Sequence, residues 1–179
     1  MDVSSIFKKT KTINKADEIE RKQVIEMLNL SVKTVRKIST QLRPSILDDL
    51  GVTATFEWQI SDFEKRTGIY CNFYCNVDES AVSVEAKNNL FRILQESLTN
   101  IMRHAAATKV NIDFFIIAKE LRLIIADNGK GFNQNLPKQT LGLLGMRERT
   151  AMLNGSFVVA SEKKKGTRII ITIPINGSE

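Results

Sequence analysis

The hydrophobic residues in the first part of the chain predict a long helix with one apolar seam. Between residues 24 and 42 the apolar residues follow a heptad spacing, about seven residues for every two helical turns. They are Val24, Leu28, Val35, Ile38 and Leu42. Ser31 occupies the one position of this apolar seam that has no apolar residue. The seam predicts a helix that packs on a partner helix, although a single amphipathic helix packed on its own domain has the same pattern. Pro44 ends or kinks the helix near Arg43.

Three further segments with helical spacing follow. The first runs from about Val52 to Arg66 and stops at Gly68, a residue suited to a C-terminal cap. The second covers about Ser83 to Ala107, and the third begins around a Gly-x-x-Gly segment and ends near Leu153. The apolar stripes are Val52, Phe56, Ile60 and Phe63 in the first, and Leu90, Ile93, Leu94, Leu98, Ile101 and Met102 in the second.

Several runs with strand character separate these helices. They are Ile69–Val77, Val110–Ala118, Leu121–Ala126, Ser156–Ser161 and Arg168–Ile175. Strands interleaved with helices predict an α+β fold, a two-layer sandwich in which helices cover one face of a mixed sheet. Residues 1–16 are polar and show no sustained hydrophobic periodicity. They are expected to form a leader segment, either ordered or partly disordered.

Cys71 and Cys75 are the only cysteines of the chain. On a strand they share one face with Ile69, Phe73 and Val77, which predicts that both thiols belong to the core. A metal site would need more thiolate or imidazole ligands, and the single histidine lies in a different segment. Because residues 1–22 lack a signal-peptide pattern, both thiols are expected to be reduced.

The composition allows one substantial core plus a smaller helical appendage, with 42% hydrophobic residues among 179. No apolar run is long enough to span a bilayer, and residues 1–22 lack a signal-peptide pattern, which predicts a cytoplasmic location without membrane contact. The net charge of +6 is dispersed without aromatic interleaving, which predicts no nucleic-acid partner. The run Lys163–Lys165 is expected to be a solvated hairpin tip.

The segment Asp127-Asn128-Gly129-Lys130-Gly131-Phe132 is the first candidate for a ligand site. It directly follows an apolar strand, so the carboxylate of Asp127 is held at a strand end, where it can bind a base edge or a metal. Gly129 and Gly131 let the backbone pass close to a ligand. An ordinary strand-to-loop connection has the same pattern.

The helix before this segment carries four polar residues beside its apolar stripe: Glu96, Asn100, Arg103 and His104. Their spacing places a carboxylate, an amide, a cation and an imidazole along one adjoining face. One side-chain oxygen, such as that of Asn100, is enough for Mg²⁺ when phosphate and water complete its shell, and Arg103 could neutralise phosphate charge. A solvated polar face is the alternative.

Two further glycine motifs follow in the sequence. Gly142 and Gly145 lie at the start of a helix, whose unpaired N–H groups suit phosphate, although a cap or a close helix contact is equally consistent. Gly166-Thr167 opens the last strand and could place a hydroxyl near a ligand. The polar segment Asn133–Thr140 contains a proline and is expected to be a mobile lid or an ordinary surface loop.

In this order the motifs resemble the ATP-binding domain of sensor histidine kinases, which shares the Bergerat ATP-binding fold with DNA gyrase, a heat-shock chaperone and a mismatch-repair ATPase. They are Glu96-x-x-x-Asn100, Asp127-x-Gly129-x-Gly131, Gly142-x-x-Gly145 and Gly166-Thr167. The nitrate-sensor class, which includes the membrane-fluidity sensor of bacilli, is indicated by the segments Leu42–Gly51, Arg103–Ala105 and Gly145–Arg149. The resemblance covers about residues 20 to 175.

The resemblance implies ATP and Mg²⁺ as cofactors. It implies that Asp127 accepts a hydrogen bond from the adenine amino group and that Thr167 lies beside the adenine. Asn100 would bind Mg²⁺, and Glu96 would be catalytic, supporting the metal shell or polarising a nucleophile. The remaining implied cofactor-binding residues are Arg103, His104, Gly129, Gly131, Gly142 and Gly145. Relatives often place a glycine where this chain has Thr140, which leaves the path of the lid open.

Kinases of this class phosphorylate a histidine on the first helix of a dimeric bundle, whereas the only histidine of this chain is His104. Residues 17–48 resemble the second bundle helix, so the acceptor helix is expected before Met1 or absent, and residues 49–179 form the catalytic domain. The implied partners are that acceptor helix, a response regulator and a second copy of the chain. The alternatives are a nucleotide-sensing module without phosphoryl transfer and an anti-sigma-type serine kinase.

Overall fold

The computed structural model describes residues 24–25, 27–28, 45–133 and 141–175. The chain divides into two units, Met1–Ser45 and Ile46–Glu179. In the first unit Val24 and Leu28 are helical and exposed. The predicted leader and the rest of the predicted seam lie outside the described residues, so the partner of this helix stays a prediction.

Helix α2 (Ser45–Thr67) is interrupted at Gly51, which has a φ of 81° and a ψ of 173°. Just after the break, the backbone N–H groups of Val52 and Thr53 donate to the Glu79 carboxylate at 3.1 and 3.0 Å. A carboxylate at this place caps the start of a helix, because it satisfies N–H groups that have no partner within the helix. The helix predicted from Val52 is confirmed, and Gly51 together with Glu79 explains why it starts there.

Glu79→Ala is expected to lower the free energy of unfolding by about 0.5–2 kcal/mol, the usual cost of removing a helix cap. Equilibrium urea denaturation measures this, with Glu57→Ala on the exposed side of the same helix as the control. An equal loss in both variants would contradict the capping role.

The same variant has a pH signature. Partial burial raises the pKa of Glu79, but the hydrogen bonds from Thr53 and Val52 and the charge of Lys87 outweigh it, so the pKa is lowered overall. A lowered pKa means that the cap stabilises the fold above the pKa of the unfolded chain, about 4.3, and that this contribution is lost as the pH falls through the folded value. The difference between wild type and Glu79→Ala should therefore shrink in acid.

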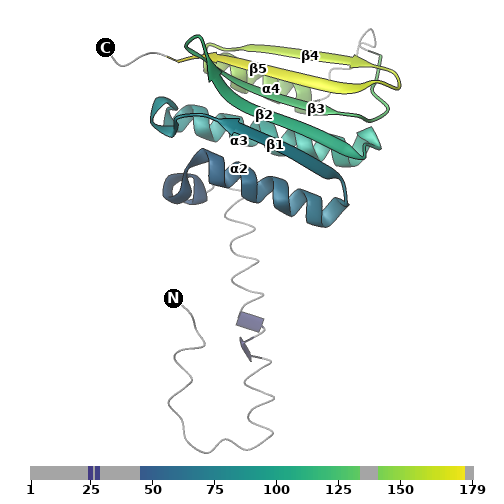
Figure 1. Ribbon diagram of the computed structural model, residues 1–179, viewed down its shortest axis with the longest axis horizontal. Coiled ribbons are helices and arrows are strands. Elements are labelled where there is room, and N and C mark those ends of the chain that lie inside the picture. Colours follow the sequence, from purple (N-terminus) through teal and green to yellow (C-terminus); the bar gives the residue numbers. More distant parts are fainter. Residues whose placement is uncertain (1–23, 26, 29–44, 134–140, 176–179) are drawn as a thin grey trace, which may run out of the picture. The chain divides into compact units, whose positions relative to one another are not determined.

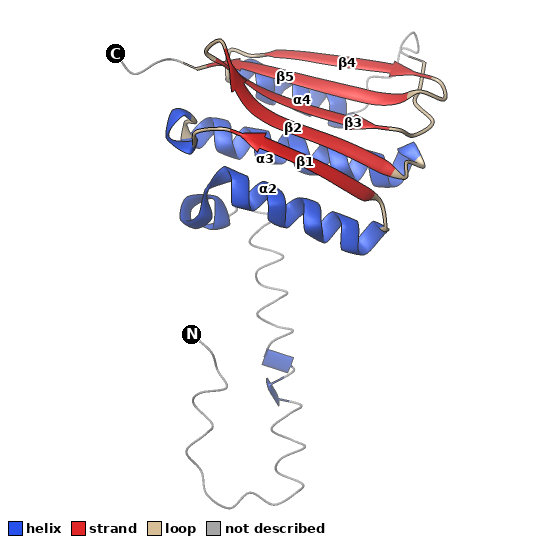
Figure 2. Ribbon diagram, in the orientation of Figure 1, coloured by secondary structure: helices blue, strands red, loops and turns tan. Residues whose placement is uncertain are grey.

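A five-stranded sheet forms one layer, and helices pack on one of its faces (Figures 1 and 2). The strands are β1 (Tyr70–Asn76), β2 (Lys109–Ile117), β3 (Glu120–Asp127), β4 (Ser156–Glu162) and β5 (Gly166–Pro174). Their order is β1-β2-β3-β5-β4; β1 is parallel to β2 and the other neighbours are antiparallel. The predicted mixed sheet is confirmed, and each predicted strand end lies within two residues of the observed one.

The core lies between the sheet and helices α2, α3 (Val84–Asn100) and α4 (Leu141–Met152). Phe56 of α2 is fully buried at its centre, with its ring centroid 5.0 Å from that of Phe114 on β2 and 6.5 Å from that of Phe91 on α3. Because the alternate residues of each strand face the helices, the alternation along the sequence determines which side chains form the core. Among the described residues, no helix has the length and apolar character needed to cross a membrane.

Helix α3 ends in a π-helical turn that its sequence pattern does not indicate. Ser83 Oγ caps its start by accepting from the Ala86 N–H at 3.1 Å, and α3 continues beyond Asn100 into a π-helical turn, η3 (Ile101–Ala105). Ala106 then has a φ of 50°, and the Ala105 carbonyl accepts from the Lys130 N–H at 2.8 Å. The helix predicted from about Ser83 to Ala107 is therefore confirmed to within two residues at both ends, with a π-helical last turn.

Both cysteines lie on the predicted face of β1 and both are free. Cys71 is buried, and its burial, with a smaller contribution from the Glu64 charge, raises the pKa of the thiol to about 12. Cys75 packs against the core, with its Sγ 3.5 Å from Thr53 Oγ1. The prediction that these thiols serve packing is confirmed.

Candidate functional site

The segment after β3 is held in place at both ends. Asp127 Oδ1 accepts from the Gly129 N–H at 2.8 Å, which folds the turn back on itself. Gly129 is buried against η3, where an added Cβ would lie 2.8 Å from the Cβ of Ala105. Only a residue without a side chain lets the turn lie this close to η3.

The second half of the segment is joined to the hairpin between β4 and β5. Gly131 has a φ of 56°, and an added Cβ there would overlap the carbonyl oxygen of Glu162 and lie 2.7 Å from that of Gly166. The Lys164 N–H donates to the Lys130 carbonyl at 2.7 Å. The loop is therefore fixed between η3 and the β4–β5 hairpin, which makes Asp127 a pre-positioned group.

Asn128 supports the same loop from its other side. Its Oδ1 accepts from the N–H groups of Thr108 and Lys109, each at 2.9 Å, and its Nδ2 donates to Thr108 Oγ1 at 2.9 Å. The sequence alone assigns no role to Asn128, because asparagine is common in turns and nothing local indicates the strand that it reaches.

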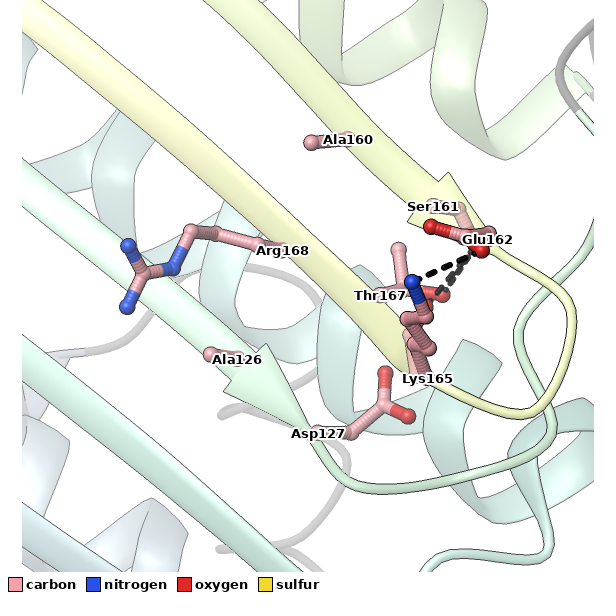
Figure 3. Close-up of a pocket in the computed structure, with 9 residues that line it drawn as sticks. Ala126, Asp127, Ala160, Ser161, Glu162, Lys165, Thr167 and Arg168 are labelled. Atoms are coloured by element: carbon pink, nitrogen blue, oxygen red, sulfur yellow. Dashed lines mark hydrogen bonds and ion pairs between the residues drawn. The ribbon is translucent and has the colours of Figure 1, made fainter.

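Asp127 lines a cavity of about 340 Å³ at the end of the sheet (Figure 3). The lining residues are Ala126, Asp127, Ala160, Ser161, Glu162, Lys165, Gly166, Thr167 and Arg168. Figure 3 shows the Asp127 carboxylate pointing toward the start of β5, next to Thr167, its partner in the β3–β5 ladder. The cavity therefore contains the predicted pair Asp127 and Thr167 together with Ser161 and Lys165, which were not predicted as site residues.

The electrostatics of Asp127 follow from this position. Burial raises the pKa of its carboxyl group, and hydrogen bonds from the backbone N–H groups of Gly129 and Thr167 partly offset the rise. A half-buried carboxylate that already accepts backbone hydrogen bonds is an acceptor of fixed direction, suited to an amine donor on a ligand.

The lysine hairpin tip is confirmed, since Lys163–Lys165 connects β4 and β5, but its residues do more than meet solvent. Lys165 Nζ forms an ion pair with Glu162 at 2.9 Å and lines the cavity beside Asp127. The sequence does contain an indication of this second role, because Lys165 directly precedes the predicted site motif Gly166-Thr167.

A second group of predicted residues lines a groove between α3 and α4. This groove, about 280 Å³ in volume, is lined by Arg92, Gln95, Glu96, Thr99, Leu141, Gly142, Gly145, Met146 and Arg149. Gly142 lies directly against the Glu96 carboxylate, so any side chain there would collide with it, whereas Gly145 has open space in front of its Cα. Glu96 and Gly142 are therefore neighbours although 46 residues separate them in sequence.

Asn100 lies one turn after Glu96, and its Nδ2 donates to Glu96 Oε1 at 3.4 Å. This leaves the amide oxygen of Asn100 as a hard oxygen donor, the ligand type that Mg²⁺ prefers. The described residues contain no cluster of three or more His, Cys, Asp and Glu side chains that could hold a metal by themselves. The donor set thus fits a cation that is shared with phosphate and water.

The structure separates the remaining predicted residues from these two groups. Arg103 and His104 lie on η3, their side chains are exposed, and they line neither cavity. η3 joins the groove to the Asp127 loop, because it follows Asn100 directly and its last residue contacts Lys130 and Gly129. Residues 134–140, which include most of the predicted lid and Thr140, lie outside the described part of the chain.

Comparisons with known proteins agree with this architecture. A family model described as "Histidine kinase-, DNA gyrase B-, and HSP90-like ATPase" matches residues 85–177. The histidine kinase domain of the blue-light activated histidine kinase from Erythrobacter litoralis has a similar fold, with a TM-score of 0.66 at 19% identity over 90% of this chain and 86% of that one.

Relatives found by sequence similarity carry the names of histidine kinases. The chain is 37% identical over 161 residues to the signal transduction histidine-protein kinase/phosphatase DegS of Brevibacillus brevis, which covers 89% of this chain and 42% of DegS. It is 33% identical over 156 residues to the oxygen sensor histidine kinase NreB of Staphylococcus carnosus, covering 86% of this chain and 45% of NreB. The chain thus spans less than half the length of these relatives. It belongs to the family of histidine kinase-, DNA gyrase B- and HSP90-like ATPases and is homologous to the catalytic domain of two-component sensor histidine kinases.

Proposed function

We propose that this chain is the ATP-binding catalytic part of a two-component sensor histidine kinase and that it transfers the γ-phosphoryl group of ATP to a histidine located outside this chain. The observation that carries the proposal is the fixed Asp127 carboxylate in its cavity together with the groove lined by Glu96 and Gly142. Asn100 bonds to Glu96 and leads into η3, which contacts the Asp127 loop. The Asp127 cavity suits a base with an amino group, and the groove beside Glu96 suits a phosphate chain with a cation.

At the base end, the Asp127 carboxylate accepts a hydrogen bond from the adenine amino group, and Thr167 lies beside the ring. Gly129 and Gly131 keep the loop narrow enough to pass the nucleotide. The atoms that close these two positions belong to the protein, to Ala105 at Gly129 and to Glu162 and Gly166 at Gly131, so the glycines also hold the Asp127 loop in position.

At the phosphate end, Asn100 would hold Mg²⁺ through its amide oxygen. When bound, this ion neutralises charge on the phosphates. Arg103 and His104 are exposed on the adjoining turn, where they can meet phosphate oxygens, and Gly142 and Gly145 expose backbone at the start of α4. Glu96 is the proposed catalytic residue, which accepts a hydrogen bond from the attacking imidazole and so orients its lone pair toward phosphorus.

The partners of the whole protein follow from the same proposal. They are an acceptor-histidine helix, a response regulator that takes the phosphoryl group onward, and a second copy of the chain through the seam of the first unit. A cytoplasmic site of action, in a protein whose other parts are free to be membrane-anchored, is consistent with this role.

The test separates ATP binding from phosphoryl transfer. Titration calorimetry measures ATP affinity with and without Mg²⁺, and γ-labelled ATP measures transfer to an acceptor-helix fragment supplied in trans. Glu96→Gln is expected to bind ATP within about threefold of wild type while transfer falls by roughly 10²–10⁴-fold, the usual contribution of a general acid–base group. Glu57→Gln, on exposed α2 surface, is the matched control.

Three outcomes decide between the candidate functions. Transfer to the histidine fragment supports the kinase. ATP binding without transfer supports a nucleotide-sensing module, and transfer to a serine supports an anti-sigma-type kinase. If the wild-type chain binds neither ATP nor ADP, the proposal fails altogether.

A further inference from the structure

Ser161 lies at the end of β4 and joins three segments of the cavity wall. Its Oγ is 2.9 Å from the backbone nitrogen of Phe132, 3.0 Å from the carbonyl oxygen of Gly166 and 3.0 Å from Thr167 Oγ1. Figure 3 shows the Ser161 and Thr167 side chains meeting beside Asp127. No sequence motif drew attention to this serine.

The directions of these hydrogen bonds are determined by chemistry. A carbonyl oxygen can only accept, so the Ser161 hydroxyl proton points to Gly166. A backbone N–H can only donate, so the Phe132 N–H uses one of the two lone pairs of Ser161 Oγ. In the remaining contact Ser161 has no proton left, and the Thr167 hydroxyl must therefore be the donor.

These hydrogen bonds determine whether the Thr167 hydroxyl can donate to a ligand or only accept from it. Its single hydroxyl proton is used by Ser161, so only its oxygen lone pairs are left for the cavity. The neighbouring Asp127 carboxylate is also an acceptor, and the two residues face each other across the β3–β5 ladder. This part of the cavity wall therefore presents acceptors on both strands, and a ligand carbonyl placed there would meet no donor from them.

We propose that Ser161 is a specificity-determining residue: by taking the hydroxyl proton of Thr167, it makes the cavity select purines with a 6-amino group over purines with a 6-oxo group. This inference rests on the proposed ATP-binding function and adds the residue that sets its base preference. Ser161 acts through Thr167 and the loop, so its role is that of a positioning residue.

The experiment compares the affinities of ATP and inosine triphosphate, which carries a 6-oxo group in place of the amine. Wild type should prefer ATP. Ser161→Ala frees the Thr167 hydroxyl to donate to the 6-oxo group, and the preference should narrow by roughly fivefold, the effect of one hydrogen bond. Ser161→Thr keeps the hydroxyl and should restore the wild-type ratio within about twofold, and Ser156→Ala at the other end of β4 should leave it unchanged.

A double-mutant cycle separates this role from a merely structural one. In a Thr167→Val background no hydroxyl remains to be oriented, so adding Ser161→Ala should leave the ATP-to-inosine triphosphate ratio unchanged within about twofold. Equal weakening of both nucleotides by Ser161→Ala, or a ratio change that persists in the Thr167→Val background, would overturn the proposal.

Two further outcomes are kept distinct. If Ser161→Ala does not fold by circular dichroism, Thr167→Val alone decides: a loss of ATP affinity with unchanged inosine triphosphate affinity supports the inference, and equal losses overturn it. If wild type binds neither nucleotide, the proposed function itself fails, and the inference that rests on it is withdrawn.

Discussion

Asp127→Asn is expected to weaken ATP binding by between about 10-fold and about 150-fold. This range corresponds to the roughly 1.5–3 kcal/mol of a hydrogen bond to a charged acceptor. The amide can still accept the Gly129 N–H through its oxygen, but it then turns an NH₂ donor toward the amino group of the base. Titration calorimetry with ATP measures this loss of affinity. The matched control is Asp113→Asn, which lies on the face of β2 that points away from the core.

The same substitution should not destabilise the fold. Burial raises the pKa of Asp127 above its unfolded value, so the folded state binds the proton more tightly and stability is lost as the pH rises through the folded pKa. At pH 7 the half-buried carboxylate is charged, and burying this charge lowers the free energy of unfolding. The neutral amide does not carry this charge and avoids the loss. The midpoint of thermal unfolding should therefore be equal to or higher than that of wild type; a clear decrease together with lost binding would indicate misfolding instead.

Gly131→Ala is expected to lower the free energy of unfolding by at least about 2 kcal/mol, since overpacking alone costs about 1–3 kcal/mol and the positive φ adds to it. The new Cβ would overlap the Glu162 carbonyl oxygen, a backbone atom that cannot move without breaking the hairpin. The loop would shift, so ATP affinity should fall as well. Equilibrium denaturation and ATP titration of the same variant measure the two effects.

Gly145→Ala provides the comparison for stability. Gly145 is helical and has nothing within 4 Å of an added Cβ, so alanine should be neutral or stabilise by up to about 1 kcal/mol. If both glycine variants lose the same stability, the backbone clash at Gly131 is not the cause.

Local patterns were enough to predict the elements of this fold. The stripe from Val52 to Phe63 and the alternation in Ile69–Val77 gave a helix and a strand because both depend on which side chains must be buried. The π-helical turn at Ile101–Ala105 was beyond such reasoning. The last residue of this turn, Ala105, accepts a hydrogen bond from Lys130, which lies 25 residues further along the sequence.

The residues of the candidate site also fall into two groups, those that the sequence predicted and those that it did not. Asp127, Thr167, Glu96 and Gly142 were singled out because their residue types at those spacings match a family motif, and the structure brings them together as two pairs. Ser161 and Asn128 carry no such signal, because their roles depend on partners across strands. The roles of Arg103 and His104 stay predictions, since both are exposed and line neither cavity.

The strand order also has a consequence for biosynthesis. β5 is the last strand in sequence, yet it lies between β3 and β4 in the sheet. Until β5 has been synthesised, β3 and β4 have no strand between them, and Asp127 lacks its ladder partner Thr167. Nucleotide can therefore select only chains that have completed this insertion, and its binding free energy is added to the stability of the finished domain. Ligand binding at Asp127 and Thr167 therefore depends on the last strand of the sequence being in place.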